Sequence, residues 1–453
     1  MLFDNISYVD KNFELKRGWV ATEGNRIVYV GSEPPADMAN AGAGASADAA
    51  TGAKAGAGAI KDYGEIVNGK GKLLIPGMHN AHAHSPMTLL RGYAENLPLS
   101  AWLNEKVFPF EAHINDERAL PATRLAIAEM LRFGVVAFAD MYYFADARAK
   151  AAMESGIKLN MSQGIIVFDE SLSYDDLPAK STNEYIFNQY HNANDGQIKI
   201  DLCVHTEYTT TERVVRAVGD LAVEFGVNTH IHLSETKSEH EQCKQRRAGK
   251  TPAEYFESLG FFRQPCLAAH CVWAEPSDWQ IFKEHNVTAV CNPASNMKLG
   301  SGFAPVGQML KAGVNVALGT DGVASNNSHN LLKDVYLLAT IYKGFTGDTT
   351  NITPAEALYA ATRAGALAMG RSDSGLIATG MRADLVMLDT AVPWMQPEHD
   401  ALNNLVYSAQ GTDVMLTMVD GKVCYRNGEW SGIDVQKAIA QTDECAKAIL
   451  SEL

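Results

Sequence analysis

Four segments of the chain place histidine or carboxylate side chains directly after short apolar runs. The first is Leu73-Leu74-Ile75 followed by Pro76–His84, which ends in His82-Ala83-His84. The later ones are Thr229–Glu235, with His230, His232 and Glu235; Leu267–His270; and Ala317–Gly322, with Asp321. Side chains two positions apart on a strand point the same way, so His82 and His84 share a face. Three histidines and an aspartate form a nitrogen and oxygen ligand set that suits Zn²⁺ or Fe²⁺.

The third histidine ligand has two candidates, because His230 and His232 share one face of their strand. We favour His232, since Glu235 follows it by three residues and would lie over the same metal. Six other histidines are expected to be structural or exposed: His79, His113, His240, His285, His329 and His399.

Such segments can form one site only if a scaffold brings their ends together. Residues 76–374 alternate between expected strands at 135–139, 228–233, 267–270, 287–290 and 314–318 and expected helices at 117–133, 211–225, 275–284 and 308–312. This order predicts a (β/α)8 TIM barrel, in which catalytic groups lie at the carboxyl ends of the strands. A doubly wound sheet is the alternative, but no G-x-G-x-x-G turn follows an early strand.

The segments on either side of the predicted barrel indicate a second, smaller unit. Residues 1–75 contain expected strands at 18–21 and 26–30, and residues 375–433 contain expected strands at 385–388, 415–419 and 422–425. We expect these N- and C-terminal parts to pair into one small composite β-sandwich. An Ala/Gly-rich stretch at 36–59 is interpreted as an insertion in a hairpin connection, and residues 434–453 as an amphipathic C-terminal helix.

The composition excludes several classes of function. The net charge of -15 argues against nucleic acid and anionic membrane surfaces as partners. No stretch is apolar over the roughly 18 residues that a membrane span needs, and we see no signal peptide. The seven cysteines are scattered and form no C-x-x-C, which predicts reduced thiols and a cytoplasmic protein.

The combined motifs resemble the amidohydrolase superfamily over nearly the whole chain apart from 36–59. Four further segments are similar to the 5-methylthioadenosine/S-adenosylhomocysteine deaminases within it. They are Met87–Gly92, Trp102–Glu111, Asn292–Leu299 and Asp321–Asn327. Gly375–Val386 also resembles the return strand of the superfamily's composite β domain.

The resemblance implies that His82, His84, His232 and Asp321 hold one divalent metal, with Zn²⁺ favoured and Fe²⁺ as the alternative. A bound metal lowers the pKa of water from 15.7 to about 7. Asp321 would take a proton from this water, Glu235 would protonate the ring nitrogen beside the reacting carbon, and His270 would hydrogen-bond the attacking oxygen. Binuclear relatives use a carboxylated lysine, whereas Lys199 lies at the wrong end of its strand, which favours a single metal.

The resemblance also implies a purine nucleoside substrate. Glu111 would bind the ribose hydroxyls, His205 would contact the purine, Trp102 would pack on the substrate, and Glu235 would reach its ring. Relatives that bind S-adenosylhomocysteine hold its carboxylate with an arginine after the third strand. Here no arginine lies between Arg148 and Arg213, and the loop 168–176 is acidic. We therefore favour 5′-methylthioadenosine, adenosine or 5′-deoxyadenosine over S-adenosylhomocysteine.

Two alternative functions remain open at this point. The same scaffold supports aminohydrolases or chlorohydrolases of a free base or a triazine, and some relatives are non-catalytic proteins that retain the fold. Such scaffold proteins lose ligands, whereas all six metal and proton-transfer residues are present here. We also expect a homo-oligomer.

Overall fold

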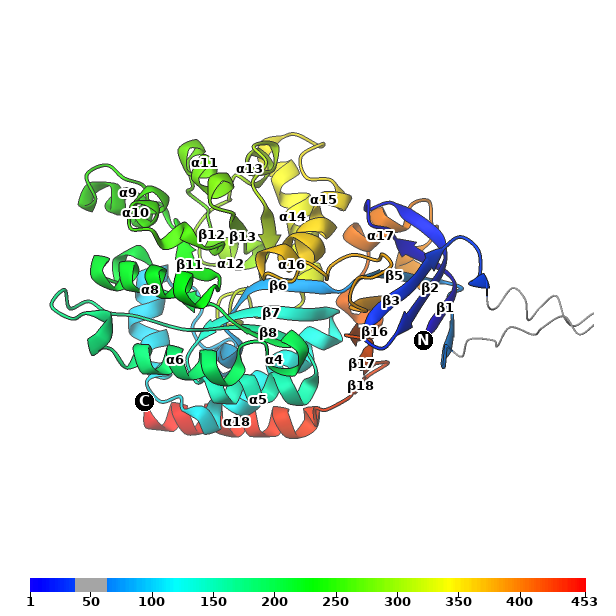
Figure 1. The fold of residues 1–453 in the computed structure, drawn as a ribbon, viewed down its shortest axis with the longest axis horizontal. Helices are drawn as coiled ribbons and strands as arrows, with labels where there is room; N and C mark the ends of the chain where they lie inside the picture. Colours follow the sequence, from blue (N-terminus) through cyan, green and yellow to red (C-terminus); the bar gives the residue numbers. More distant parts are fainter. Residues whose placement is uncertain (37–62) are drawn as a thin grey trace, which may run out of the picture.

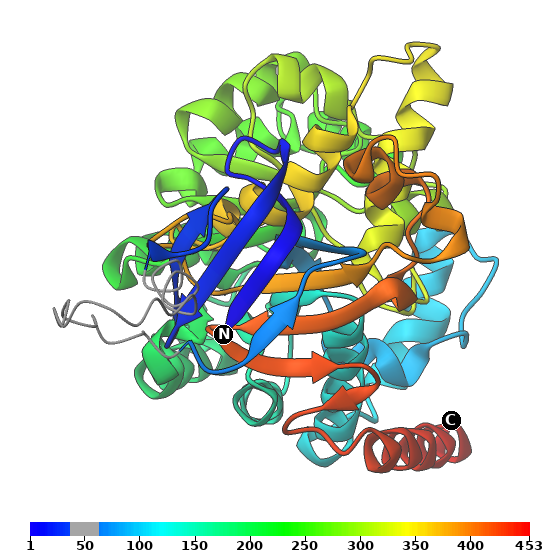
Figure 2. The same cartoon turned by 90° about the vertical axis from the view of Figure 1, so that its right-hand side faces the viewer.

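The computed structural model describes residues 1–36 and 63–453, so the predicted insertion at 36–59 falls almost entirely outside the described residues. A barrel of parallel strands fills one side of the molecule, and a sheet built from both ends of the chain covers the other side (Figure 1). The C-terminal helix lies along the outside of the barrel (Figures 1 and 2). No helix in the described part of the chain has the length and apolar character that crossing a membrane requires.

The barrel confirms the predicted fold class. Its strands are β6 (Met78–Ala83), β7 (Val135–Tyr142), β8 (Lys158–Gln163), β9 (Ile198–Ile200), β10 (Leu202–Cys203), β11 (Thr229–Leu233), β12 (Cys266–His270), β13 (Val287–Cys291) and β14 (Val316–Leu318). β9 and β10 occupy one strand position, interrupted at Asp201. Neighbouring strands pair in parallel from β6 to β9 and from β10 to β14, and a bridge between Ala83 and Asp321 joins the first strand to the last.

Helices surround the barrel and follow its strands in the expected alternation. They are η1 (Ser85–Leu90), α2 (Leu99–Ala101), η2 (Trp102–Val107), α3 (Phe108–Glu111), α4 (Asp116–Arg132), α5 (Ala145–Ser155), α6 (Pro178–Tyr190), α8 (Glu212–Phe225), α9 (Lys237–Arg246), α10 (Pro252–Ser258), α11 (Pro276–Glu284), α12 (Pro293–Lys298), α13 (Val306–Lys311), α14 (Leu331–Thr346), α15 (Pro354–Tyr359), η6 (Ala360–Ala364), α16 (Gly365–Ala368), α17 (Ala401–Tyr407) and α18 (Val435–Glu452). Several start at a side-chain cap; Asn115 and Asp434, for example, accept the free backbone N–H groups of α4 and α18.

Both ends of the chain contribute to a nine-stranded sheet, as expected for the composite β unit. Its strands are β1 (Leu2–Val9), β2 (Leu15–Glu23), β3 (Arg26–Gly31), β4 (Ile66–Asn68), β5 (Lys72–Pro76), β15 (Leu385–Asp389), β16 (Val414–Val419), β17 (Lys422–Arg426) and β18 (Glu429–Trp430). β5 lies between β1 and β15 and continues through Gly77 into β6. A Cβ at Gly77 would stand 2.4 Å from Val136, so this junction requires glycine. The exact division into domains stays a prediction.

Two sequence predictions differ from the structure in ways that matter for function. The strand expected at 135–139 extends to Tyr142, and its last three residues face the ligand-bearing end of β6. The strand β8 and the helix α14 were not predicted. β8 reads Lys-Leu-Asn-Met-Ser-Gln, whose polar residues hide its burial from a search for apolar runs.

A buried ion pair fastens the barrel to the sheet. Lys158 at the start of β8 lies 2.5 Å from Asp384, just before β15, and 2.8 Å from Asp420 in the turn after β16. The Lys158 side chain is 4% exposed and that of Asp384 is fully buried. Removing the cation leaves a buried carboxylate without its counter-charge.

Lys158→Met should therefore lower the free energy of unfolding by about 3–5 kcal/mol, measured by chemical denaturation at pH 7. The exposed Lys180, which pairs with Asp175, provides the control, and Lys180→Met should cost less than about 1 kcal/mol. Equal losses would contradict the role of burial. Although burial opposes it, Lys158 holds the pKa of Asp384 below its usual value. The stabilisation is thus present above the unfolded carboxyl pKa of about 3.9 and is lost as the pH falls below it.

Candidate active site

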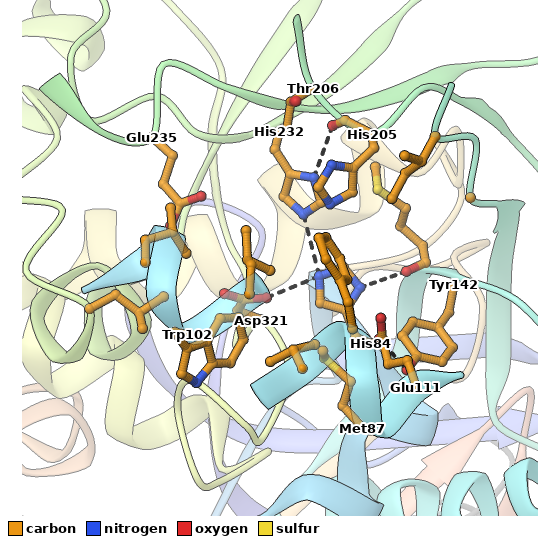
Figure 3. A pocket seen from close by; sticks show the side chains of 18 of the residues that line it. His84, Met87, Trp102, Glu111, Tyr142, His205, Thr206, His232, Glu235 and Asp321 are labelled. Atoms are coloured by element: carbon orange, nitrogen blue, oxygen red, sulfur yellow. Dashed lines mark hydrogen bonds and ion pairs between the residues drawn. The ribbon is translucent and has the colours of Figure 1, made fainter. Parts of the chain in front are cut away.

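Four predicted side chains converge at the carboxyl end of the barrel. The Nε2 atom of His84 lies 3.1 Å from Asp321 Oδ1 and 3.3 Å from His232 Nε2. His82 Nε2 lies 3.5 Å from the same Asp321 oxygen. Figure 3 shows His84 between His232 and Asp321, with Glu235 on the far side of the pocket. The structure thus brings together the four residues that the sequence analysis selected as a ligand set.

The Nδ1 atom of each imidazole contacts a residue of another strand or of the loop that follows it. His84 Nδ1 donates to the Met141 carbonyl at 2.6 Å and His232 Nδ1 donates to the His205 carbonyl at 3.0 Å. His82 Nδ1 lies 3.0 Å from His230 Nε2. His230 therefore contacts a candidate ligand and does not join the cluster itself. These contacts direct the three Nε2 atoms toward a common point.

The donor atoms fit a divalent cation. Ligand atoms about 2.0–2.1 Å from a tetrahedral Zn²⁺ lie about 3.3 Å from one another, close to the three distances given above. His82 Nε2 is buried and has no hydrogen-bond partner among the described residues. Burial lowers the pKa of His82 to about 4 and that of His232 well below its usual value, so both imidazoles carry lone pairs at neutral pH.

The Asp321 carboxylate is oriented by hydroxyl groups. Ser295 and Ser325 donate to its Oδ2 atom at 2.6 and 2.9 Å, which leaves Oδ1 facing the histidines. Asn80 of the opening motif bonds both the amide and the hydroxyl of Thr320, beside Asp321. Gly319 allows this close approach, since a Cβ there would stand 2.8 Å from that of His82.

Glu235 and His270 lie next to the ligand cluster and face each other. Their nearest side-chain atoms, Glu235 Oε2 and His270 Nε2, are 3.8 Å apart, and Asn296 Oδ1 accepts from His270 Nδ1 at 2.8 Å. Burial raises the pKa of Glu235 and favours its protonated form. The Glu239 carboxylate accepts from the backbone N–H groups of the preceding turn, including Glu235 itself at 2.8 Å. A carboxyl group with a raised pKa and an imidazole beside a candidate cation site are suited to proton transfer.

A pocket with about 710 Å³ of atom-free space, part of it open to solvent, lies over this cluster. Its lining includes the ligand residues His84, His232 and Asp321. The other predicted residues that line it are Trp102, Glu111, His205, Glu235 and His270. Of the predicted site residues, only His82 is not part of this lining.

The sequence analysis missed the contribution of β7. Asp140, Met141 and Tyr142 at its carboxyl end contact the helix after β6, the ligand His84 and the carboxylate of Glu111, respectively. A search for polar residues directly after apolar runs, which located the other strand ends, would also have found this one, because Asp140 follows the apolar run 135–139. Lys199, in contrast, lies at the opposite end of the barrel, where its Nζ donates to Gly370.

Metal binding should depend on His82, whose buried Nε2 atom has no hydrogen-bond partner among the described residues. We expect purified protein to contain a divalent metal and to lose thermal stability on chelation. Adding Zn²⁺ back at a free concentration of 100 times its Kd should raise the free energy of unfolding by about 2.7 kcal/mol. His82→Ala should abolish this response in thermal unfolding and in metal analysis, whereas the exposed His399→Ala should retain it. An unchanged response in His82→Ala would contradict the site.

Comparison with known proteins agrees with this geometry. The amidohydrolase family matches residues 73–424. The 5-methylthioadenosine/S-adenosylhomocysteine deaminase of Dictyoglomus thermophilum is 39% identical over 391 residues, covering 86% of this chain and 90% of the relative. The 5′-deoxyadenosine deaminase of Methanosarcina mazei is 38% identical over 389 residues, covering 86% and 89%. A zinc-bound adenosine deaminase from Xanthomonas campestris superimposes with a TM-score of 0.88 at 30% identity and covers 99% of this chain and 98% of its own. The predicted resemblance is confirmed, and the chain belongs to the amidohydrolase family.

Proposed function

We propose that this chain is a metal-dependent hydrolase that removes the amino group of adenosine-type nucleosides, giving the inosine analogue and ammonia. The observation that carries the proposal is the presence of Glu111 in the same pocket as His84, His232 and Asp321. A carboxylate offers acceptor sites for both vicinal hydroxyls of a ribose. The relatives described above are named as deaminases of adenosine or of its derivatives, which supports the same assignment.

The cofactor in this proposal is one divalent cation per subunit, held by His82, His84, His232 and Asp321, with Zn²⁺ favoured over Fe²⁺. Such a cation supplies a nucleophile by lowering the pKa of water to about 7. Nitrogen ligands with a single carboxylate are the donor set that zinc accepts. The zinc in the Xanthomonas campestris structure supports the choice of metal.

The residues around the pocket provide the proton transfers. Asp321 accepts a proton from the attacking water, and Glu235 donates its proton to the ring nitrogen next to the amine-bearing carbon. His270 donates or accepts a hydrogen bond at the attacking oxygen. The leaving nitrogen then takes the proton from Asp321 and departs as ammonia, while Glu235 recovers a proton from the new hydroxyl as the carbonyl forms. Both carboxyl groups end the cycle in their starting states.

The charges of the pocket favour a neutral 5′ substituent. Its lining contains three carboxylates, Glu111, Glu235 and Asp321, and no lysine or arginine among the described residues. Arg148 is fully buried and donates to Asp140, Tyr142 and Ser162. A substrate carboxylate would therefore find no counter-charge in this lining. We propose 5′-methylthioadenosine, adenosine and 5′-deoxyadenosine as substrates, with S-adenosylhomocysteine less favoured.

A substrate panel tests this function. Purified protein is assayed for loss of the adenine absorbance with the three neutral nucleosides and with S-adenosylhomocysteine, and the metal content of the same sample is measured. We expect kcat/KM for the neutral nucleosides to exceed that for S-adenosylhomocysteine by about tenfold or more, since every 1.4 kcal/mol is tenfold. Turnover of adenine or a chlorotriazine without turnover of any nucleoside would refute the proposal.

Glu235→Gln tests the assigned proton donor. Glutamine keeps the shape of the side chain but cannot supply the proton, so kcat should fall about 10²- to 10⁴-fold. The metal content should remain that of the wild type, because Glu235 is not a proposed ligand. Near-normal turnover in this variant would remove Glu235 from the proton transfer.

The cellular location and the oligomeric state stay predictions. All seven cysteines are free, and six of them are buried, which agrees with the reduced thiols expected of a cytoplasmic protein. The homo-oligomer predicted from the sequence is likewise a proposal.

A further inference from the structure

Among the described residues, Tyr142 is the one hydrogen-bond partner of the Glu111 carboxylate within the pocket. Glu111 is the last residue of α3, outside the barrel strands, and its Oε1 atom accepts a short hydrogen bond from the hydroxyl of Tyr142. Tyr142 is the last residue of β7 and is 5% exposed. The pair lies below His84 in the pocket shown in Figure 3.

The same strand end also holds the metal-site histidine. The residue before Tyr142, Met141, accepts from His84 Nδ1 through its carbonyl at 2.6 Å. The residue before that, Asp140, accepts from the backbone N–H and the hydroxyl of Ser85 at 2.6 and 2.7 Å. Three consecutive residues of one strand thus contact a candidate metal ligand, the start of η1 and Glu111.

Tyr142 has little freedom of its own. Its carbonyl accepts from Arg148 at 3.0 Å and from the Gly164 amide at 3.1 Å. Its ring contacts those of Tyr143 and His84, with centroids 5.5 and 6.1 Å away. Since Arg148 is itself fully buried on Asp140, the hydroxyl of Tyr142 is fixed relative to the barrel.

The segment that carries Glu111 is less regular than a barrel strand. It consists of the short helices α2, η2 and α3, which place Trp102 and Glu111 in the pocket lining. Burial raises the pKa of Glu111, whereas the Tyr142 hydroxyl favours the ionised carboxylate. With Oε1 occupied by Tyr142, the Oε2 atom is the one left to accept from a substrate.

We propose that Tyr142 is a positioning residue for the vicinal hydroxyls of the substrate sugar: it orients the Glu111 carboxylate and fixes its distance from the metal ligands. This inference rests on the nucleoside deaminase function proposed above. Tyr142 acts through Glu111 and takes no part in the proton transfers.

Tyr142→Phe removes the hydroxyl and keeps the ring. The test compares adenosine with 2′,3′-dideoxyadenosine, which carries the same base without the vicinal hydroxyls. For adenosine we expect kcat/KM to fall about 10- to 100-fold, as for a lost hydrogen bond to a charged group. For the dideoxy nucleoside kcat/KM should stay within about twofold, since no sugar hydroxyl depends on Glu111 there. The metal content should not change.

Two further variants sharpen the result. Glu111→Gln should likewise lower kcat/KM for adenosine but not for the dideoxy nucleoside. In the double variant Glu111→Gln with Tyr142→Phe, the fold loss in kcat/KM for adenosine should be smaller than the product of the two single losses, because the two groups act as a unit. Tyr185→Phe is the control: its hydroxyl also donates to a carboxylate, Asp146, but it lies outside the pocket lining, and its kinetics should match the wild type. Equal losses with both nucleosides, or multiplicative losses in the double variant, would overturn the inference while leaving the deaminase function intact. A wild-type protein that deaminates no adenosine nucleoside would instead overturn the function itself.

Discussion

The structure depends on one constraint: four candidate ligand atoms must face each other at the end of the barrel. Three imidazole nitrogens and one carboxylate oxygen stand 3.1–3.5 Å from their neighbours in the cluster. Each side chain is held in this orientation by a contact on its other polar atom. The Met141 and His205 carbonyls accept from His84 and His232, His230 pairs with His82, and two serines donate to Asp321. The barrel supplies these partners because its strand ends converge, and the cluster in turn favours a cation.

The backbone next to these side chains adopts conformations that are energetically unfavourable. Ser234, His270 and Asp321 all adopt positive φ angles, 50°, 73° and 60°, which side chains other than glycine rarely take. They follow or end β11, β12 and β14, the strands that carry Glu235, His270 and Asp321. Conformations of this kind cost on the order of 1–3 kcal/mol each and persist where the surroundings over-determine them. At the first turn, the backbone N–H of Ser234 donates to the Glu239 carboxylate. At the second, the backbone N–H of Asp321 donates to the His82 carbonyl, and the neighbouring Thr320 donates to Asn80.

Much of this could be predicted from the sequence, for reasons that particular residues make clear. Strand alternation alone puts His82 and His84 on one face, and apolar runs locate β11, β12, β13 and β14 to within two residues. Alternation could not separate His230 from His232, because the choice depends on height along the barrel axis and on contacts with other strands. Tyr142 carries no chemical signature of its own; its importance comes from a partner 31 positions away in an irregular segment. Glu111 was identified only through the family resemblance, since it belongs to no barrel strand.

The junction between β5 and β6 has a consequence for how the protein is made. β5 is paired on one side with β1 and on the other with β15, roughly 300 residues later, and Gly77 donates to Asp384 just before β15. A ribosome that adds about 5–20 residues per second needs on the order of tens of seconds to cover that distance. During this interval the strand that leads into the histidine pair has an open edge, although the histidines themselves were translated early. Closure of this edge is thus a late event in synthesis, set by the arrival of the carboxyl-terminal strand β15.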